Sequence, residues 1–173
     1  FGLRTNLLNW AFLSPGMGVD LSWNSRYMIT LDGNYGDWDI NYPDKRIRLS
    51  SAGVELRRYF CNGAVGCWAN PNGDPYRGFY IGIDGRYTEF NRTLATNGRE
   101  GKMITAGLLA GYTFRLRGNW GVDASIGAGY VHNDYNRYQW YEPAEMYRVT
   151  KEKKSDFFSL TNLNVSLFYR FKL

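Results

Sequence analysis

Histidine, cysteine and proline are scarce in this chain, and long apolar runs are missing. One histidine and two cysteines in 173 residues leave too few nitrogen and sulfur ligands for a zinc or iron site of the usual His/Cys kind. No apolar stretch approaches the roughly 20 residues of a membrane-spanning helix, and the mean hydropathy is −0.46. These absences exclude a helical membrane protein, and we expect neither a metal nor another cofactor.

A strong charge of either sign is also missing. The 21 Lys and Arg residues against 16 Asp and Glu residues give a net charge of +5. This mild excess does not predict a nucleic-acid partner, and no feature of the sequence indicates a small-molecule substrate. The length fits a single domain over residues 1–173.

Glycine and aromatic residues are abundant, with 20 Gly, 14 Tyr, 10 Phe and 6 Trp, which favours an all-β fold. Apolar and polar residues alternate with period two, as in strands whose two faces meet different surroundings. The alternation predicts seven strands and a less regular first one, at residues 3–12, 17–24, 27–35, 52–57, 79–88, 104–116, 120–130 and 162–173. Eight strands can close a small barrel.

The predicted connections alternate in length. Short turns follow the second and sixth strands, whereas residues 37–46, 91–101 and 133–154 are long and polar. Short turns at one end and long loops at the other are typical of an up-and-down transmembrane β-barrel in an outer membrane. Aromatic residues near strand ends fit girdles at the two lipid boundaries, although ordinary core aromatics are the alternative: Trp23, Tyr27, Tyr35, Trp38, Tyr87, Trp120 and Tyr130.

The polar face of these strands predicts a packed interior. It carries Gly, Ser, Thr, Asn, Asp and Arg, and the chain has only 6 Lys against 15 Arg. Arg tolerates buried pairing better than Lys, and buried charges must be balanced. We therefore expect a closed, charge-filled lumen that includes Asp20, Asp32, Arg115, Asp123 and Arg170.

Two short motifs with the same spacing stand on neighbouring predicted strands. Glu55 and Arg57 lie two residues apart, as do Asp84 and Arg86. One antiparallel register would pair Glu55 with Arg86 and Arg57 with Asp84. The spacing predicts a four-residue charge cluster that plugs the barrel, and a chance coincidence of two short motifs is the alternative.

Several segments resemble a family of small outer-membrane barrels of the Bacteroidetes type, whose function is unknown. The resemblance rests on residues 3–10 (LRTNLLNW), 15–21 (PGMGVDL), 53–59 (GVELRRY), 80–87 (YIGIDGRY) and 121–130 (GVDASIGAGY). It implies an OmpA-like, eight-stranded barrel without a peptidoglycan-binding domain, sometimes encoded beside fimbrial genes. It supplies no catalytic residues.

The location follows from the barrel prediction. The chain begins at Phe1 without Met, so we expect an exported protein integral to an outer membrane, with both termini in the periplasm. Cys61 and Cys67 could then form a disulfide, with two free thiols as the alternative.

We expect a non-enzymatic, structural or accessory subunit of a cell-envelope complex for outer-membrane protein assembly, secretion or fimbriae. Its partners would be the lipid bilayer, lipopolysaccharide and other outer-membrane or surface proteins. Tyr, Trp and Arg concentrate interface energy, so the predicted partner surface is Tyr135, Tyr138, Trp140, Tyr141 and Tyr147. One alternative is a lipid A-modifying enzyme centred on His132, and a further alternative is a soluble ligand-binding barrel.

Overall fold

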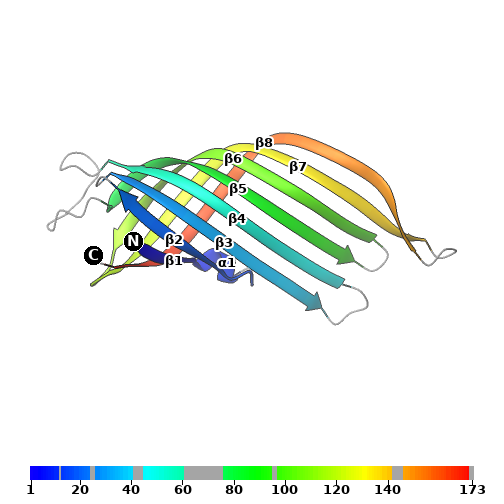
Figure 1. Cartoon of the computed structure of the whole chain (residues 1–173), viewed down its shortest axis with the longest axis horizontal. Coiled ribbons are helices and arrows are strands. Elements are labelled where there is room, and N and C mark those ends of the chain that lie inside the picture. The colour runs from blue at the N-terminus through cyan, green and yellow to red at the C-terminus, as the bar shows by residue number, and fades with distance from the viewer. Residues whose placement is uncertain are drawn as a thin grey trace.

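Eight antiparallel strands form one closed barrel in chain order, with β1 paired to both β2 and β8 (Figure 1). The computed structural model describes residues 1–11, 13–23, 26–40, 45–60, 76–94, 97–141 and 146–171. The predicted all-β fold with eight strands is confirmed. The elements are β1 (Gly2–Asn6), α1 (Leu7–Ala11), β2 (Gly16–Trp23), β3 (Tyr27–Ile40), β4 (Lys45–Tyr59), β5 (Gly78–Leu94), β6 (Asn97–Arg115), β7 (Trp120–Tyr141) and β8 (Met146–Arg170).

The strands differ greatly in length. β1 and β2 have 5 and 8 residues, whereas β7 and β8 have 22 and 25. β1 meets β8 only from the pair Gly2 and Arg170 to the pair Asn6 and Ser166. The ring is therefore complete near the two termini, which we call the terminal end. At the opposite, extended end, β3 to β8 continue as a curved six-stranded wall (Figure 1).

Strand pairing reaches much further into the polar segments than the sequence predicts. The long loops expected at residues 37–46, 91–101 and 133–154 are mostly strand, because β3 continues to Ile40, β5 to Leu94 and β7 to Tyr141. Only residues 41–44, 95–96 and 142–145 separate the paired strands there. Alternating hydropathy marks a strand only while its faces meet different surroundings. Where both faces are polar that signal disappears, although the backbone pairing continues.

The first strand is shorter than the predicted range 3–12, because it gives way to helix α1. The side-chain oxygen of Asn6 accepts hydrogen bonds from the backbone N–H groups of Leu8 (2.9 Å) and Asn9 (3.3 Å), which caps the helix. After the helix, Leu13 has a left-handed backbone with φ 55°. Its N–H donates to the carbonyl of Trp10, and the N–H of Ser14 donates to that of Asn9, so the chain turns sharply toward β2.

Burial follows the strand alternation, but in the opposite sense to that of a water-soluble protein. The polar face is the buried one: Arg57 and Asp123 are 0 % exposed. On the other face, Leu108 is 71 % and Phe158 is 78 % exposed. A single-layered sheet can bury side chains only on the side that the ring encloses, so the charges are interior and the apolar residues exterior. No helix among the described residues is long and apolar enough to cross a membrane.

Candidate functional site

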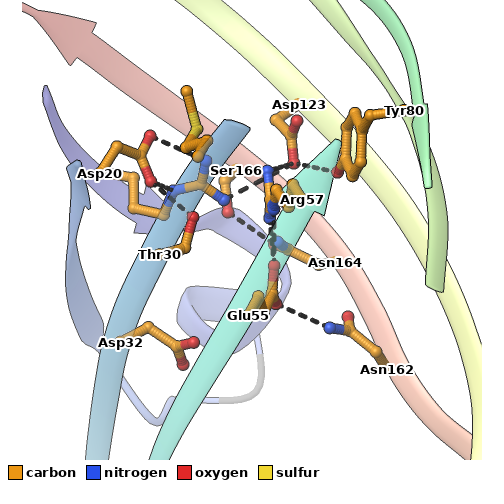
Figure 2. A network of polar contacts seen from close by, with 12 residues as sticks. Asp20, Thr30, Asp32, Glu55, Arg57, Tyr80, Asp123, Asn162, Asn164 and Ser166 are labelled. Atoms are coloured by element: carbon orange, nitrogen blue, oxygen red, sulfur yellow. Dashed lines mark hydrogen bonds and ion pairs between the residues drawn. The ribbon is translucent and has the colours of Figure 1, made fainter. Parts of the chain in front are cut away.

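Arg57 on β4 is the centre of a buried network of charges (Figure 2). Its Nε donates to Glu55 Oε2 at 2.8 Å, and its Nη1 lies 3.0 Å from Asp123 Oδ1. Glu55 stands two residues before Arg57, so the strand alternation places both side chains on the interior face. The guanidinium also lies over the Tyr80 ring, 4.7 Å from its centroid. Arg57 thus joins two carboxylates from different sides of the interior.

Arg4 on β1 extends this network to the other side of the ring. Its Nε lies 2.6 Å from Asp20 Oδ1, and its Nη1 lies 3.6 Å from Asp123 Oδ1. Asp20 also accepts a hydrogen bond of 2.8 Å from the hydroxyl of Thr30. The two arginines and the three carboxylates Asp20, Glu55 and Asp123 are each at most 5 % exposed. Near balance of buried charge is what a poorly hydrated interior requires.

Neutral polar groups saturate the remaining carboxylate oxygens. Tyr80 and Thr113 donate to Asp123 at 2.9 and 2.8 Å, and the amide of Asn162 donates to Glu55 at 2.8 Å. The alternation places these residues on the polar face, but no sequence signal connects Tyr80 with Asp123 or Asn162 with Glu55, which are 43 and 107 positions apart. Hydrogen bonds to charged groups are stronger than those between neutral groups, so these side chains hold the network in one arrangement.

The predicted pairing of Glu55 with Arg86 and of Arg57 with Asp84 is wrong. The register differs by two residues: Glu55 faces Asp84, Arg57 faces Gly82, and Arg86 faces Gly53. A shift of two leaves every side chain on its face, so the alternation cannot distinguish the two registers. Residues 60–77 separate β4 from β5, so the sequence offers no short hairpin turn from which to read the register. In the observed register each large guanidinium lies beside a glycine, where the narrow interior has room.

The four predicted residues consequently belong to different groups. Glu55 and Arg57 lie in the central network, whereas Arg86 binds Asp32 on β3, with 2.9 Å between Nη1 and Oδ2. Asp84 accepts a hydrogen bond of 3.4 Å from the hydroxyl of Thr161. The remaining interior candidates, Arg115 and Arg170, are partly buried near the terminal end; Arg170 donates to the carbonyl of Tyr76 at 3.1 Å.

The centre of the interior leaves little room for a ligand. A cavity of about 20 Å³ lies beside Arg4, Asp32 and Arg86, which is enough for about one water molecule. In the part of the chain that the structure describes, no group of three His, Cys, Asp or Glu side chains could hold a metal ion. The centre of the network is therefore closely packed, and a larger cavity of about 180 Å³ lies at the terminal end, beside Arg115 and Arg170.

The exterior carries bands of different chemistry. Aromatic residues lie near the terminal end, where Phe1 stacks on Phe171 with ring centroids 4.7 Å apart and Trp120 packs against Tyr169. Apolar residues cover the middle of the strands. Toward the extended end, ion pairs follow: Asp37 with Arg48, Glu89 with Lys102, and Asp134 with Lys154.

A groove of about 740 Å³ lies in this ion-pair band. Arg48, Glu89, Glu100, Lys102 and Asp134 are among its lining residues. Acids and bases are mixed in it, so the groove does not single out a ligand of one charge sign.

His132 belongs to the exterior as well. Its Nδ1 lies 2.5 Å from Asp156 Oδ1, and the two side chains are 39 % and 52 % exposed. The hydrogen bonds from His132 and Tyr130 hold the pKa of the Asp156 carboxyl below its usual range. Acyl transfer by a Ser–His–Asp arrangement requires a serine nucleophile beside the histidine, and no serine hydroxyl among the described residues is hydrogen-bonded to His132.

The predicted partner surface and disulfide lie largely outside the described parts. Tyr135 is half-buried on β7. Tyr138, Trp140 and Tyr141 fall on β7 and Tyr147 on β8, but their side chains are not among those described. Cys61 and Cys67 lie in the undescribed segment 61–75. The partner surface and the disulfide stay predictions.

The closed ring of eight antiparallel strands and its buried charge network define an all-β protein of barrel type with a filled interior. The chain belongs to the family described as protein of unknown function (DUF3575), whose model matches residues 1–171. No curated protein and no solved structure matches it. The prediction that the chain belongs to a family of unknown function is thus confirmed. The Bacteroidetes origin and the OmpA-like relationship stay predictions.

Proposed function

We propose that this protein is an integral β-barrel of a bacterial outer membrane and a non-enzymatic, structural or accessory subunit of a cell-envelope complex. One observation carries the proposal: the charges are buried inside the ring while large apolar side chains are exposed around it. In water this exterior would be an apolar patch far larger than monomeric soluble proteins tolerate. In lipid the same exterior is matched to its surroundings.

The dimensions of the apolar exterior support this proposal. On β7 the outward residues between Trp120 and Tyr130 are Val122, Ala124, Ile126 and Ala128. The ten residue-to-residue steps from Trp120 to Tyr130 cover about 33 Å along the strand at ~3.3 Å per residue. A strand tilt of ~40° reduces this to about 25 Å across the membrane, which is the usual height of the lipid-facing band.

The ends of the barrel support an orientation and a location. The long paired strands with their exterior ion pairs would extend beyond the lipid on the cell surface, and both termini would lie in the periplasm. The lipid neighbours would be the bilayer and lipopolysaccharide. Because the centre of the interior is filled, the largest remaining surfaces for function are the exterior and the extended end, which favours docking of other outer-membrane or surface proteins.

Membrane insertion is tested by fractionation and by gel mobility. We expect the chain in the outer-membrane fraction, extracted only by detergent, and migrating faster in SDS gels before boiling than after it. A matched sample unfolded in urea before loading should show only the slow band. A chain that fractionates as a soluble protein, with no band that shifts on heating, would overturn the proposal and favour a soluble barrel.

The His132–Asp156 pair is the observation that favours the second candidate, a lipid A-modifying enzyme. We expect the lipid A mass spectrum of producing cells to equal that of cells without the chain. A mass change that His132→Ala abolishes, while the folded band persists, would establish the enzyme instead. The matched control is Lys102→Ala, which removes another exterior ion-pair residue.

A further inference from the structure

The wall of the barrel is incomplete on one side of its extended end. Toward the extended end, β1 ends at Asn6 and β2 reaches only to Gly16, its first residue. The last contact of β3 with this neighbour is the hydrogen bond from Tyr35 N–H to the carbonyl of Pro15. In the described part of the chain, residues 146–165 of β8 pair with β7 on one side and with no strand on the other. We call this gap, between residues 36–40 of β3 and 146–165 of β8, the notch. Helix α1 lies against β8 at its base.

The β8 border of the notch is apolar where it adjoins the lipid-facing exterior. Phe158 is 78 % exposed, and Leu160 and Leu163 are each 63 % exposed. Every second residue of an unpaired edge directs its N–H and C=O groups away from the sheet. Such groups are costly in lipid, where no water can satisfy them. Helix α1 adjoins part of this edge, and the rest needs another cover.

The base of the notch has a second unusual feature. Leu7, Trp10 and Leu13 are 42 %, 55 % and 69 % exposed. Leu13 is apolar, yet its φ of 55° is in the left-handed region that non-glycine residues rarely adopt. The reversal after α1 fixes this backbone, but the Leu13 side chain buries little of its surface within the described chain. The base of the notch thus presents three exposed apolar side chains.

Strand direction decides what fits the notch. β3 runs toward the extended end and β8 runs away from it, so the two borders are antiparallel to each other. A single inserted strand would be parallel to one border, whereas two antiparallel strands complete the wall with the pairing that all its other neighbours have. We propose that a β-hairpin of a partner protein docks in the notch and pairs with β8. This inference rests on the proposed membrane location.

A second copy of the chain fits the β8 border poorly. Two copies inserted in the membrane in the same direction would have parallel β8 strands. A two-fold axis along these strands would also turn one sheet over. The apolar exterior of one copy would then continue into the polar interior face of the other. The sequence of residues 148–154, RVTKEKK, has four basic residues and one acidic residue. The hairpin strand beside β8 should therefore be acidic where it lies next to residues 148–154.

Site-specific photo-crosslinking in the native membrane tests the occupant. A photoreactive amino acid replaces Phe158 or Leu160 at the notch, and Leu108 at the matched control position. Leu108 is 71 % exposed on the same apolar face, but it lies on β6 with a strand on both sides. We expect the notch positions to give an adduct with one protein, attached at a β-hairpin whose strands alternate apolar and polar residues. The Leu108 position should give no adduct.

Charge reversal tests the predicted complementarity. Lys154 and Lys102 are exposed lysines of the ion-pair band, with side chains 72 % and 68 % exposed. Lys154→Glu should lower the adduct yield roughly fivefold, which corresponds to about 1 kcal/mol. Lys102→Glu should leave the yield unchanged. Equal loss in both variants would overturn the assignment to the β8 border.

Hydrogen exchange supplies an independent readout. Backbone amides of residues 155–165 should exchange rapidly in the isolated chain and slowly in the crosslinked complex, whereas those of residues 81–87 on β5 should be slow in both. Adducts only with lipid or with a second copy, or equal adducts from Leu108, would overturn the docking while leaving membrane insertion intact. A chain missing from the outer-membrane fraction would overturn the proposed function itself.

Discussion

Arg57 is the residue on which the interior network depends most. It is fully buried between Glu55 and Asp123. Arg57→Ala would leave Glu55 without a cation and Asp123 with only the more distant Arg4, so we expect a loss of about 3–5 kcal/mol in the free energy of unfolding. The matched control is Arg58→Ala, because Arg58 is exposed on the exterior and its loss should change stability by at most about 0.5 kcal/mol.

Urea unfolding in detergent micelles, followed by tryptophan fluorescence, measures both variants. A third variant separates the charge from the packing: Arg57→Met with Glu55→Gln and Asp123→Asn removes all three charges and keeps similar volumes. It should recover a large part of the loss, since buried ion groups are often replaceable by neutral ones of similar size. Equal stability of Arg57→Ala and Arg58→Ala would contradict the network's role.

The Asp156 carboxyl should titrate at unusually low pH. Hydrogen bonds from His132 and Tyr130 lower its pKa, so the pair stabilises the folded state at neutral pH. This contribution is lost as the pH falls through the lowered pKa. Carbon-13 NMR of the Asp156 side chain should show the shift, and His132→Ala should raise the pKa toward its ordinary value of about 3.9. An unchanged pKa in His132→Ala would contradict the pairing.

The sequence predicts which residues of the network are interior but not which of them meet. Alternation places Glu55, Arg57 and Asp123 on one face because side chains of a strand have a period of two. The contact between Arg57 and Asp123 spans 66 residues and depends on how the ring closes. Closure sets the stagger of all strands together, and no single strand carries that information.

Among the elements, α1 is the one that the sequence pattern missed. Its five residues lie inside the range predicted as strand, and Asn6 caps it. A helix this short has no periodic signal. It depends on its cap and on the reversal after it, where the N–H groups of Leu13 and Ser14 satisfy carbonyls of the helix.

The left-handed backbone at Leu13 predicts the effect of a substitution there. Glycine adopts φ 55° without steric cost, so Leu13→Gly should stabilise the isolated chain by about 1 kcal/mol. Leu13→Ala keeps the strain and should not stabilise. Urea unfolding of both variants in micelles checks the difference. If Leu13→Gly is the less stable of the two, the left-handed backbone at Leu13 is not a source of strain.

The sequence predicts the strands where their two faces differ in polarity. It misses the parts of the strands where both faces are polar. The ranges 79–88 and 120–130 fall inside β5 and β7, which continue to Leu94 and Tyr141. The register between β4 and β5 was predicted two residues from its observed value. Both errors have one cause: hydropathy reports the surroundings of a face, whereas strand length and register depend on backbone pairing.

At the scale of the whole molecule, the scarcity of lysine and the small net charge have one explanation. Acids and bases are paired inside the ring, where Arg4 and Arg57 meet Asp20, Glu55 and Asp123. The polar residues that lower the mean hydropathy lie in the interior and at the extended end, and apolar residues cover the exterior between them. An average over the composition cannot show this separation, but the alternation along each strand does.

A filled interior makes the barrel a poor conductor of ions. Arg57, Tyr80 and Phe168 are at most 1 % exposed and occupy the interior together with the carboxylates. We expect no steady conductance when the purified chain is inserted in planar lipid bilayers. Arg57→Gly with Tyr80→Ala removes two large side chains around Asp123 and should produce discrete conductance steps. The matched exterior variant, Arg58→Gly with Phe79→Ala, should stay silent. Stable conductance by the unmodified chain would show that water passes the network, and the interior would then be a pore.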